Sequence, residues 1–136
     1  MNRYGPQLLI SAIVVLLVGC SSKTAPVNGR VKFKDGSDVS LLRGYTVSFE
    51  PEDDRISGAG DIGADGTFKI TTFSADDGAI PGRHRVAISP PDPPPDAPPP
   101  KPVIPQKYRD FGTSGLTADI KAGTTNNVEF ELERTP

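Results

Sequence analysis

The sequence predicts an all-β fold, a seven-stranded antiparallel β-sandwich of the prealbumin or immunoglobulin-like type. Apolar and polar residues alternate with a period of two in seven short segments between Val27 and Leu132. Clusters of Gly, Asp, Asn and Pro separate these segments, as expected for turns. No ten-residue stretch of this region repeats apolar residues at helical spacing. A small β-barrel is the alternative architecture.

The expected strands cover residues 27–33, 45–51, 56–62, 67–73, 81–89, 116–120 and 126–133. The Gly-rich third segment predicts an edge strand, and Asp65-Gly66 before the fourth is a typical hairpin turn. One face of these strands should carry the core, formed by Val31, Phe33, Val47, Phe49, Phe68, Ile70, Val86, Ile88, Val128, Phe130 and Leu132. The opposite face carries Lys, Arg and Glu, as expected for a solvated side.

Composition and charge limit the fold and the partners. The chain has 136 residues, with 35% hydrophobic and 7% aromatic residues and no Trp, which suits one modest core. The net charge is −2, and acidic and basic residues are interspersed. No basic patch is present that would neutralise phosphates, so nucleic acid is not an expected partner.

The N-terminus differs from the rest of the chain. Arg3 precedes a run of 11 residues, Leu8 to Val18, that is apolar except for Ser11. A helix needs about 20 such residues to cross a bilayer, so this run is too short. A positive start followed by a short apolar run predicts a secretory signal peptide over residues 1–19.

The end of this peptide, Leu17-Val18-Gly19-Cys20, resembles the lipobox of bacterial lipoproteins. The resemblance implies cleavage between Gly19 and Cys20 and acylation of Cys20 with palmitate-like chains, which makes a membrane the first expected partner. Residues 20–26 would then be a lipidated tether. The chain also resembles sorted lipoproteins of two-membrane bacteria, and in that resemblance the presence of Ser21 instead of an Asp after Cys20 implies the outer membrane of the cell envelope. The alternatives are a buried Cys in an N-terminal helix or an uncleaved anchor.

The remaining landmarks are the proline-rich loop, residues 90–105, and a short tail, residues 133–136. The loop holds ten of the 15 prolines, so it cannot be a central strand. We expect an exposed polyproline II excursion inside the domain of residues 27–132. Val103 and Ile104 should fold back onto the sandwich. The loop is either a stiff spacer or a docking segment of the P-x-x-P kind.

Six turn and core segments follow one another along the chain. They are "VNGRVKF", "VSFEP", "GADGTFKI", "DGAIPGRHRVAI", "IPQKYRD" and "LTADIKAGTTNNVEFEL". They resemble short exported lipoproteins of planctomycete-type bacteria with a carboxypeptidase regulatory-like (transthyretin-like) domain. The resemblance covers about residues 27–132 and implies the sandwich fold without an assigned activity. His84 stands where this family usually carries an aromatic residue.

Catalytic and cofactor chemistry is not expected. His84 is the only His, and it shares a strand face with Val86 and Ile88, which indicates a packed ring. No Gly-x-Ser-x-Gly motif accompanies it. Asp61 to Gly66 resembles the start of a calcium loop, but Gly63 and Thr72 stand where that loop needs ligands. The acidic turns at residues 51–55 and 75–78 are solvated turns or, alternatively, weak calcium ligands.

The predicted function is therefore a lipid-anchored, non-catalytic module of the cell envelope with a structural, adhesion or protein-binding role. The alternative is an envelope carbohydrate-binding or hydrolase-accessory module. A sugar platform would need an exposed aromatic ring, and of the two tyrosines after the signal peptide, Tyr45 and Tyr108, only Tyr108 lies outside a clear strand. Tyr108 is thus the candidate ligand contact, with a protein or a glycan of the envelope as the partner.

Overall fold

The computed structural model describes residues 23–136 of the chain. The expected signal peptide, Gly19 and Cys20 lie outside these described residues. Seven strands occur in the expected places: β1 (Val27–Phe33), β2 (Thr46–Pro51), β3 (Gly58–Asp61), β4 (Thr67–Lys69), β5 (Gly82–Ser89), β6 (Leu116–Ile120) and β7 (Asn126–Leu132). Two short 3-10 helices, η1 (Val39–Leu42) and η2 (Gln106–Arg109), were not expected.

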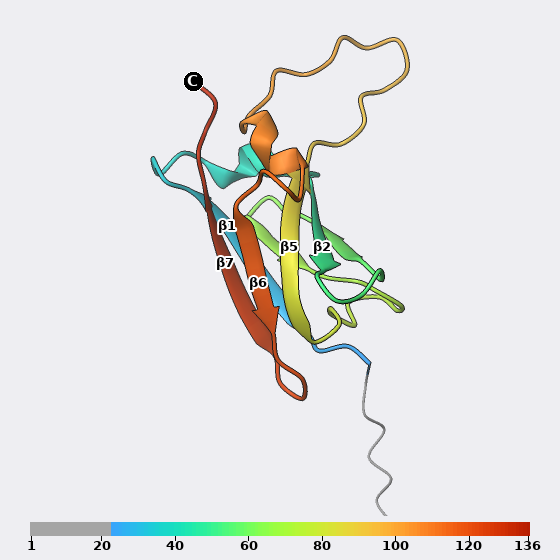
Figure 1. Cartoon of the computed structure of the whole chain (residues 1–136). Coiled ribbons are helices and arrows are strands. Elements are labelled where there is room, and N and C mark those ends of the chain that lie inside the picture. The colour runs from blue at the N-terminus through green and yellow to red at the C-terminus, as the bar shows by residue number, and fades with distance from the viewer. Residues whose placement is uncertain (1–22) are drawn as a thin grey trace, which may run out of the picture.

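The strands form two sheets, one with the order β4-β1-β7 and one with the order β3-β2-β5-β6 (Figure 1). The prediction of an all-β fold with seven strands in two sheets is confirmed. The prediction that all strands pair antiparallel is wrong, because β1 and β7 pair in parallel, from Val27 opposite Asn126 to Phe33 opposite Leu132. Parallel neighbours need a long connection, and here the whole domain lies between the first and last strands.

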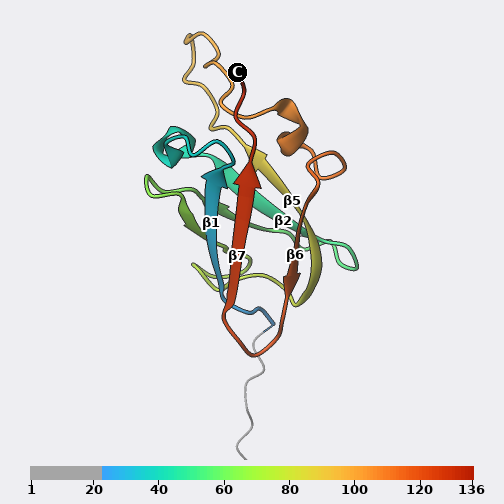
Figure 2. The ribbon, with the colours of Figure 1, turned by 90° about the vertical axis from the view of Figure 1, so that its left-hand side faces the viewer.

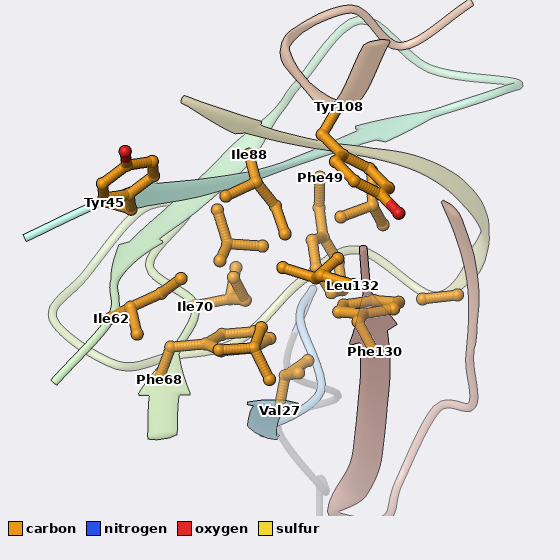
Figure 3. Close-up of a cluster of buried hydrophobic side chains, with 14 of the residues drawn as sticks. Val27, Tyr45, Phe49, Ile62, Phe68, Ile70, Ile88, Tyr108, Phe130 and Leu132 are labelled. Carbon is orange, nitrogen blue, oxygen red and sulfur yellow. The ribbon is translucent and has the colours of Figure 1, made fainter. Parts of the chain in front are cut away.

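The core lies between the two sheets and is built around three phenylalanine rings (Figure 3). Phe49 projects from the four-stranded sheet and meets Phe68 and Phe130 edge to face, with ring centroids 6.4 and 6.3 Å apart. Phe68 and Phe130 stack at 6.2 Å within the three-stranded sheet. Such pairs add stabilisation beyond the buried area alone. Period-two alternation thus predicted the inward face of these strands correctly.

Two inward positions of the three-stranded sheet, Val128 and Gly29, differ from a regular buried side chain. Val128 was expected in the core but is only partly buried. It lies on β7, an edge strand that has a neighbouring strand, β1, on one side only. Gly29 faces inward, and the Phe68 ring fills the space that a side chain would occupy, with a ring carbon 2.0 Å from an ideal Cβ. A residue without a side chain at position 29 therefore makes room for the ring.

The hairpin of β3 and β4 passes from one sheet to the other. The two segments are joined by a bridge in which Ala59 and Thr71 exchange backbone hydrogen bonds of 3.0 and 2.9 Å. At Gly60 an added Cβ would lie 1.8 Å from the Lys69 carbonyl oxygen. This close approach requires glycine at position 60. The Gly-rich strand β3 is four residues long and is thus shorter than the alternation predicted.

The sandwich has two distinct ends (Figures 1 and 2). The tether end comprises residues 23–26 and the loops 52–57, 70–81 and 121–125, since β1, β5 and β7 begin there and β2 and β6 finish there. The loop end carries the proline-rich loop, both 3-10 helices and the C-terminus. The first described residues and the proline-rich loop therefore lie at opposite ends of the fold.

Candidate functional site

The proline-rich loop leaves the fold at the end of β5 and is anchored by very little. All residues from 91 to 102 are exposed. One backbone hydrogen bond lies within the loop, from the Ala97 N–H to the Pro94 carbonyl oxygen at 3.1 Å. Asp96 adopts a φ of 67° at this turn. Because the prolines have no N–H to donate, the loop stands clear of both sheets (Figure 2).

The C-terminal end of the loop returns to the fold. Ile104 is 1% exposed and Val103 packs against the core. The Val103 carbonyl oxygen accepts a hydrogen bond of 2.8 Å from the Thr135 N–H. The expectation that these two residues fold back is confirmed. The exposed part of the loop, residues 91–102, is therefore followed by a segment that packs on the fold.

Tyr108, the candidate sugar-platform residue, lies outside the strands as predicted, but its ring is buried. It belongs to η2 and is only 3% exposed, with its ring against the core (Figure 3). Its hydroxyl oxygen accepts a hydrogen bond of 3.0 Å from the Glu133 N–H. The prediction that Tyr108 offers an exposed ring is wrong, because the turn of η2 directs the apolar ring inward. Sequence alternation could not detect this turn, which is one helical turn long.

Charged residues fasten η2 to the end of the chain. The Lys107 ammonium donates to the Glu133 carboxylate at 2.9 Å and lies 5.1 Å from the Tyr108 ring centroid. The hydrogen bond between Lys107 and Glu133 raises the pKa of Lys107 and lowers the pKa of Glu133. Both side chains are about half exposed, so the pair is worth little in stability but fixes the base of the loop.

A small groove lies between the two arms of the loop. It measures about 120 Å³ and its floor and rim combine Tyr45, Arg109 and Lys101 with prolines from both arms. Tyr45 is 7% exposed, and Figure 3 shows its hydroxyl directed away from the other core side chains. The groove therefore joins proline rings, one aromatic ring and two cationic side chains. These are groups that suit contact with another polypeptide.

A larger groove of about 800 Å³ runs beside β3 and β4. Ala59 and Gly60 of β3 contribute to its lining. Polar groups line it, among them Asn28, Lys69 and Asp61, whose carboxylate accepts a hydrogen bond of 3.1 Å from the Thr46 hydroxyl. Its volume is in the range of ligand sites. Phe68 contributes to the lining but is 3% exposed, so this groove offers no aromatic platform.

Aspartates in the turns accept hydrogen bonds from backbone N–H groups. The Asp65 carboxylate accepts from the Thr67 N–H at 3.1 Å and from the Thr67 hydroxyl at 2.7 Å. The Asp77 carboxylate accepts from three consecutive N–H groups, those of residues 72–74. Partial burial raises the pKa of Asp77, but these N–H donors outweigh it and leave the pKa below its usual value. Within residues 23–136, no three metal-ligating side chains gather in one place.

His84 is fully buried on β5, as predicted. Its Nε2 lies 2.6 Å from the Ile80 carbonyl oxygen, and its ring centroid is 5.6 Å from that of Phe49. Because a carbonyl oxygen only accepts, Nε2 carries the proton. Nδ1 is buried with no partner in the described part of the chain. These contacts, to a carbonyl group and to an apolar ring, indicate that His84 serves packing.

No family model, curated protein or solved structure matches the chain. Among residues 23–136 there is no helix of the length and hydrophobicity that a bilayer crossing requires.

Proposed function

We propose that the protein is a lipid-anchored, non-catalytic β-sandwich module of the cell envelope that presents its proline-rich loop to a protein partner. The anchor rests on the lipobox, Leu17 to Cys20, and the expected membrane is the outer membrane. A prealbumin-like sandwich as in carboxypeptidase regulatory-like domains is part of this proposal, because seven strands in two sheets agree with it.

The observation that carries the proposal is the separation of the two ends. Strand β1 leads away from residues 23–26, and β5 runs in the same sense to Ser89, where the proline-rich loop begins. A chain held by Cys20 would therefore keep the tether end towards the membrane and the loop away from it (Figure 1). The sandwich then acts as a rigid spacer.

The chemistry of the loop suits recognition of a polypeptide. Prolines lose little conformational entropy on binding, because their φ angle is fixed beforehand. The groove between the loop arms adds Tyr45 and Arg109, and both residue types are common at protein interfaces. A structural or adhesive contact needs no more than this surface.

The anchor is tested by Cys20→Ser. Wild-type protein should incorporate a labelled fatty acid and sediment with membranes, and the variant should do neither. Continued labelling and sedimentation of the variant would contradict the proposal.

The contact surface is tested by site-specific cross-linking. Ala97 on the loop and Ala122 at the tether end are both exposed alanines, so each can be changed to Cys and labelled with a photo-cross-linker. We expect position 97 to form a discrete protein adduct in whole envelopes and position 122 not to form that adduct. Equal adducts at both positions would mean that the loop is a spacer only.

The polar groove beside β3 and β4 favours a second candidate, a glycan-binding module. Asn28, Lys69 and Asp61 can exchange hydrogen bonds with sugar hydroxyl groups, and the groove volume of about 800 Å³ lies in the range of ligand sites. Calorimetry with envelope glycan fragments would test it. Binding abolished by Asn28→Ala and unchanged by loop replacement would favour the glycan over the protein partner.

A further inference from the structure

We infer that the tether end is itself a membrane-contact surface, in which Phe73 and Ile56 enter the interfacial layer of the bilayer. This inference rests on the proposed lipid anchor at Cys20. It adds a second, non-covalent contact made by the folded domain, whose occupant is a lipid surface.

The exposed apolar side chains are unevenly placed. The large hydrophobic residues exposed in the described chain are Phe73 at 53%, Ile56 at 42% and Leu41 at 42%. Ile56 lies in the loop after β2, and Phe73 lies in the loop after β4, so both belong to the tether end. Leu41 lies in η1 at the loop end. A single exposed apolar residue is ordinary, but two at the end nearest the anchor have an available partner.

The loop that carries Phe73 is held rigidly. The Asp77 carboxylate accepts from the N–H groups of Thr72, Phe73 and Ser74 at 2.7, 3.0 and 3.0 Å. The Thr72 hydroxyl donates to the Gly78 carbonyl oxygen at 2.7 Å, which closes the loop. The Phe73 ring is therefore presented on a fixed frame instead of collapsing onto the fold.

The same loop is bonded to the tether. Ala25 and Ala79 exchange backbone hydrogen bonds of 2.9 and 3.1 Å. Gly78 packs so closely on Ala25 that an added Cβ would lie 1.8 Å from the Ala25 carbonyl oxygen. Ala25 follows Cys20 by five residues, which span at most about 18 Å when fully extended. An acylated Cys20 therefore holds the Phe73 loop within reach of the headgroups.

The charges of the tether end select the kind of lipid surface. Loop 52–57 contains Glu52, Asp53 and Asp54, and the Phe73 loop contains Asp76 and Asp77. Lys23, Arg55 and Lys121 oppose them, which leaves this end slightly acidic. Attraction to anionic lipids is thus not the driving force. The contact should form on zwitterionic lipid and should depend little on salt.

The absence of Trp from the chain permits a direct test. Phe73→Trp, Ile56→Trp and Leu41→Trp each create a single fluorophore at an exposed site. The acylated full-length variants are reconstituted into phosphatidylcholine vesicles with and without brominated acyl chains. We expect a blue shift and at least about twofold quenching at positions 73 and 56, unchanged in high salt, and no quenching at position 41.

The possible failures are distinguishable. If the variants lack acyl chains or do not sediment with vesicles, the proposed anchor is wrong and this inference falls with it. If they are acylated and bound but the Phe73→Trp variant is no more quenched than the Leu41→Trp variant, only the membrane contact of the fold is wrong. Circular dichroism of each variant establishes that the exposed substitution leaves the fold intact.

Discussion

The pairing of Gly29 with Phe68 predicts a large coupling between two substitutions. The Phe68 side chain is 3% exposed, and its ring carbons would lie 2.0, 2.2 and 2.4 Å from a Cβ at position 29. Gly29→Ala therefore forces the ring out of place. Phe68→Ala removes the ring and leaves a cavity next to the same backbone. Each change alters the space that the other requires.

The expected magnitudes follow from these contacts. Phe68→Ala loses the ring contacts with Phe49 and Phe130 and should cost about 3–5 kcal/mol. Gly29→Ala should cost about 1–3 kcal/mol through overpacking. In the double variant the new methyl group enters the cavity, so the total should not exceed that of Phe68→Ala alone. The coupling free energy is then about 1–3 kcal/mol.

Urea unfolding followed by circular dichroism measures all four proteins of the cycle. Lys32→Ala is the control, because this side chain is 47% exposed and pairs with two exposed carboxylates, so its removal should leave the free energy of unfolding nearly unchanged. Additive effects of Gly29→Ala and Phe68→Ala would refute the packing argument. So would equal destabilisation by Phe68→Ala and Lys32→Ala, since the strand phase would then be wrong.

Two further predictions concern the loops. Replacing Pro91 to Pro100 by four Gly/Ser residues should shift Tm by less than about 4 °C in a thermal melt, since both loop arms border one small groove; a loss of several kcal/mol would show that the loop packs as part of the fold. Asp77→Asn should cost about 1 kcal/mol, while Asp76→Asn should be neutral. Because the pKa of Asp77 is lowered in the fold, its contribution is complete above the unfolded-state pKa and is lost as the pH falls through the folded pKa. Wild type and Asp77→Asn should therefore converge in urea titrations below about pH 4, and a constant difference between about pH 7 and pH 3 would contradict this role.

The strands could be predicted because alternation determines which face of a strand is buried. β1 and β6 occur with the expected bounds, and the inward residues of β2 and β5 are buried as expected. Alternation does not encode strand direction, so the parallel pairing of β1 with β7 could not be predicted. Direction depends on how the chain crosses between sheets over its whole length.

The candidate surfaces were predictable only in part. Proline content identified the exposed loop, since proline cannot donate to a sheet. Tyr108 was misplaced because η2 is four residues long and leaves no periodic pattern. The bracing of the Phe73 loop by Asp77 was also missed, although an Asp near a tight turn is a known acceptor of backbone N–H groups. The acidic turn at residues 75–78 suggested weak metal ligands, whereas the Asp77 carboxylate accepts hydrogen bonds from the backbone N–H groups of residues 72–74.

The central claim, anchoring through Cys20, is tested most directly by the mass of the N-terminal peptide of the protein extracted from membranes. Trypsin cleaves after Lys23, so the mature N-terminus is released as Cys20-Ser21-Ser22-Lys23. We predict that this peptide begins at Cys20 and carries a thioether-linked diacylglyceryl group. An unmodified Cys20 within a longer peptide that retains residues of the apolar run would contradict the account.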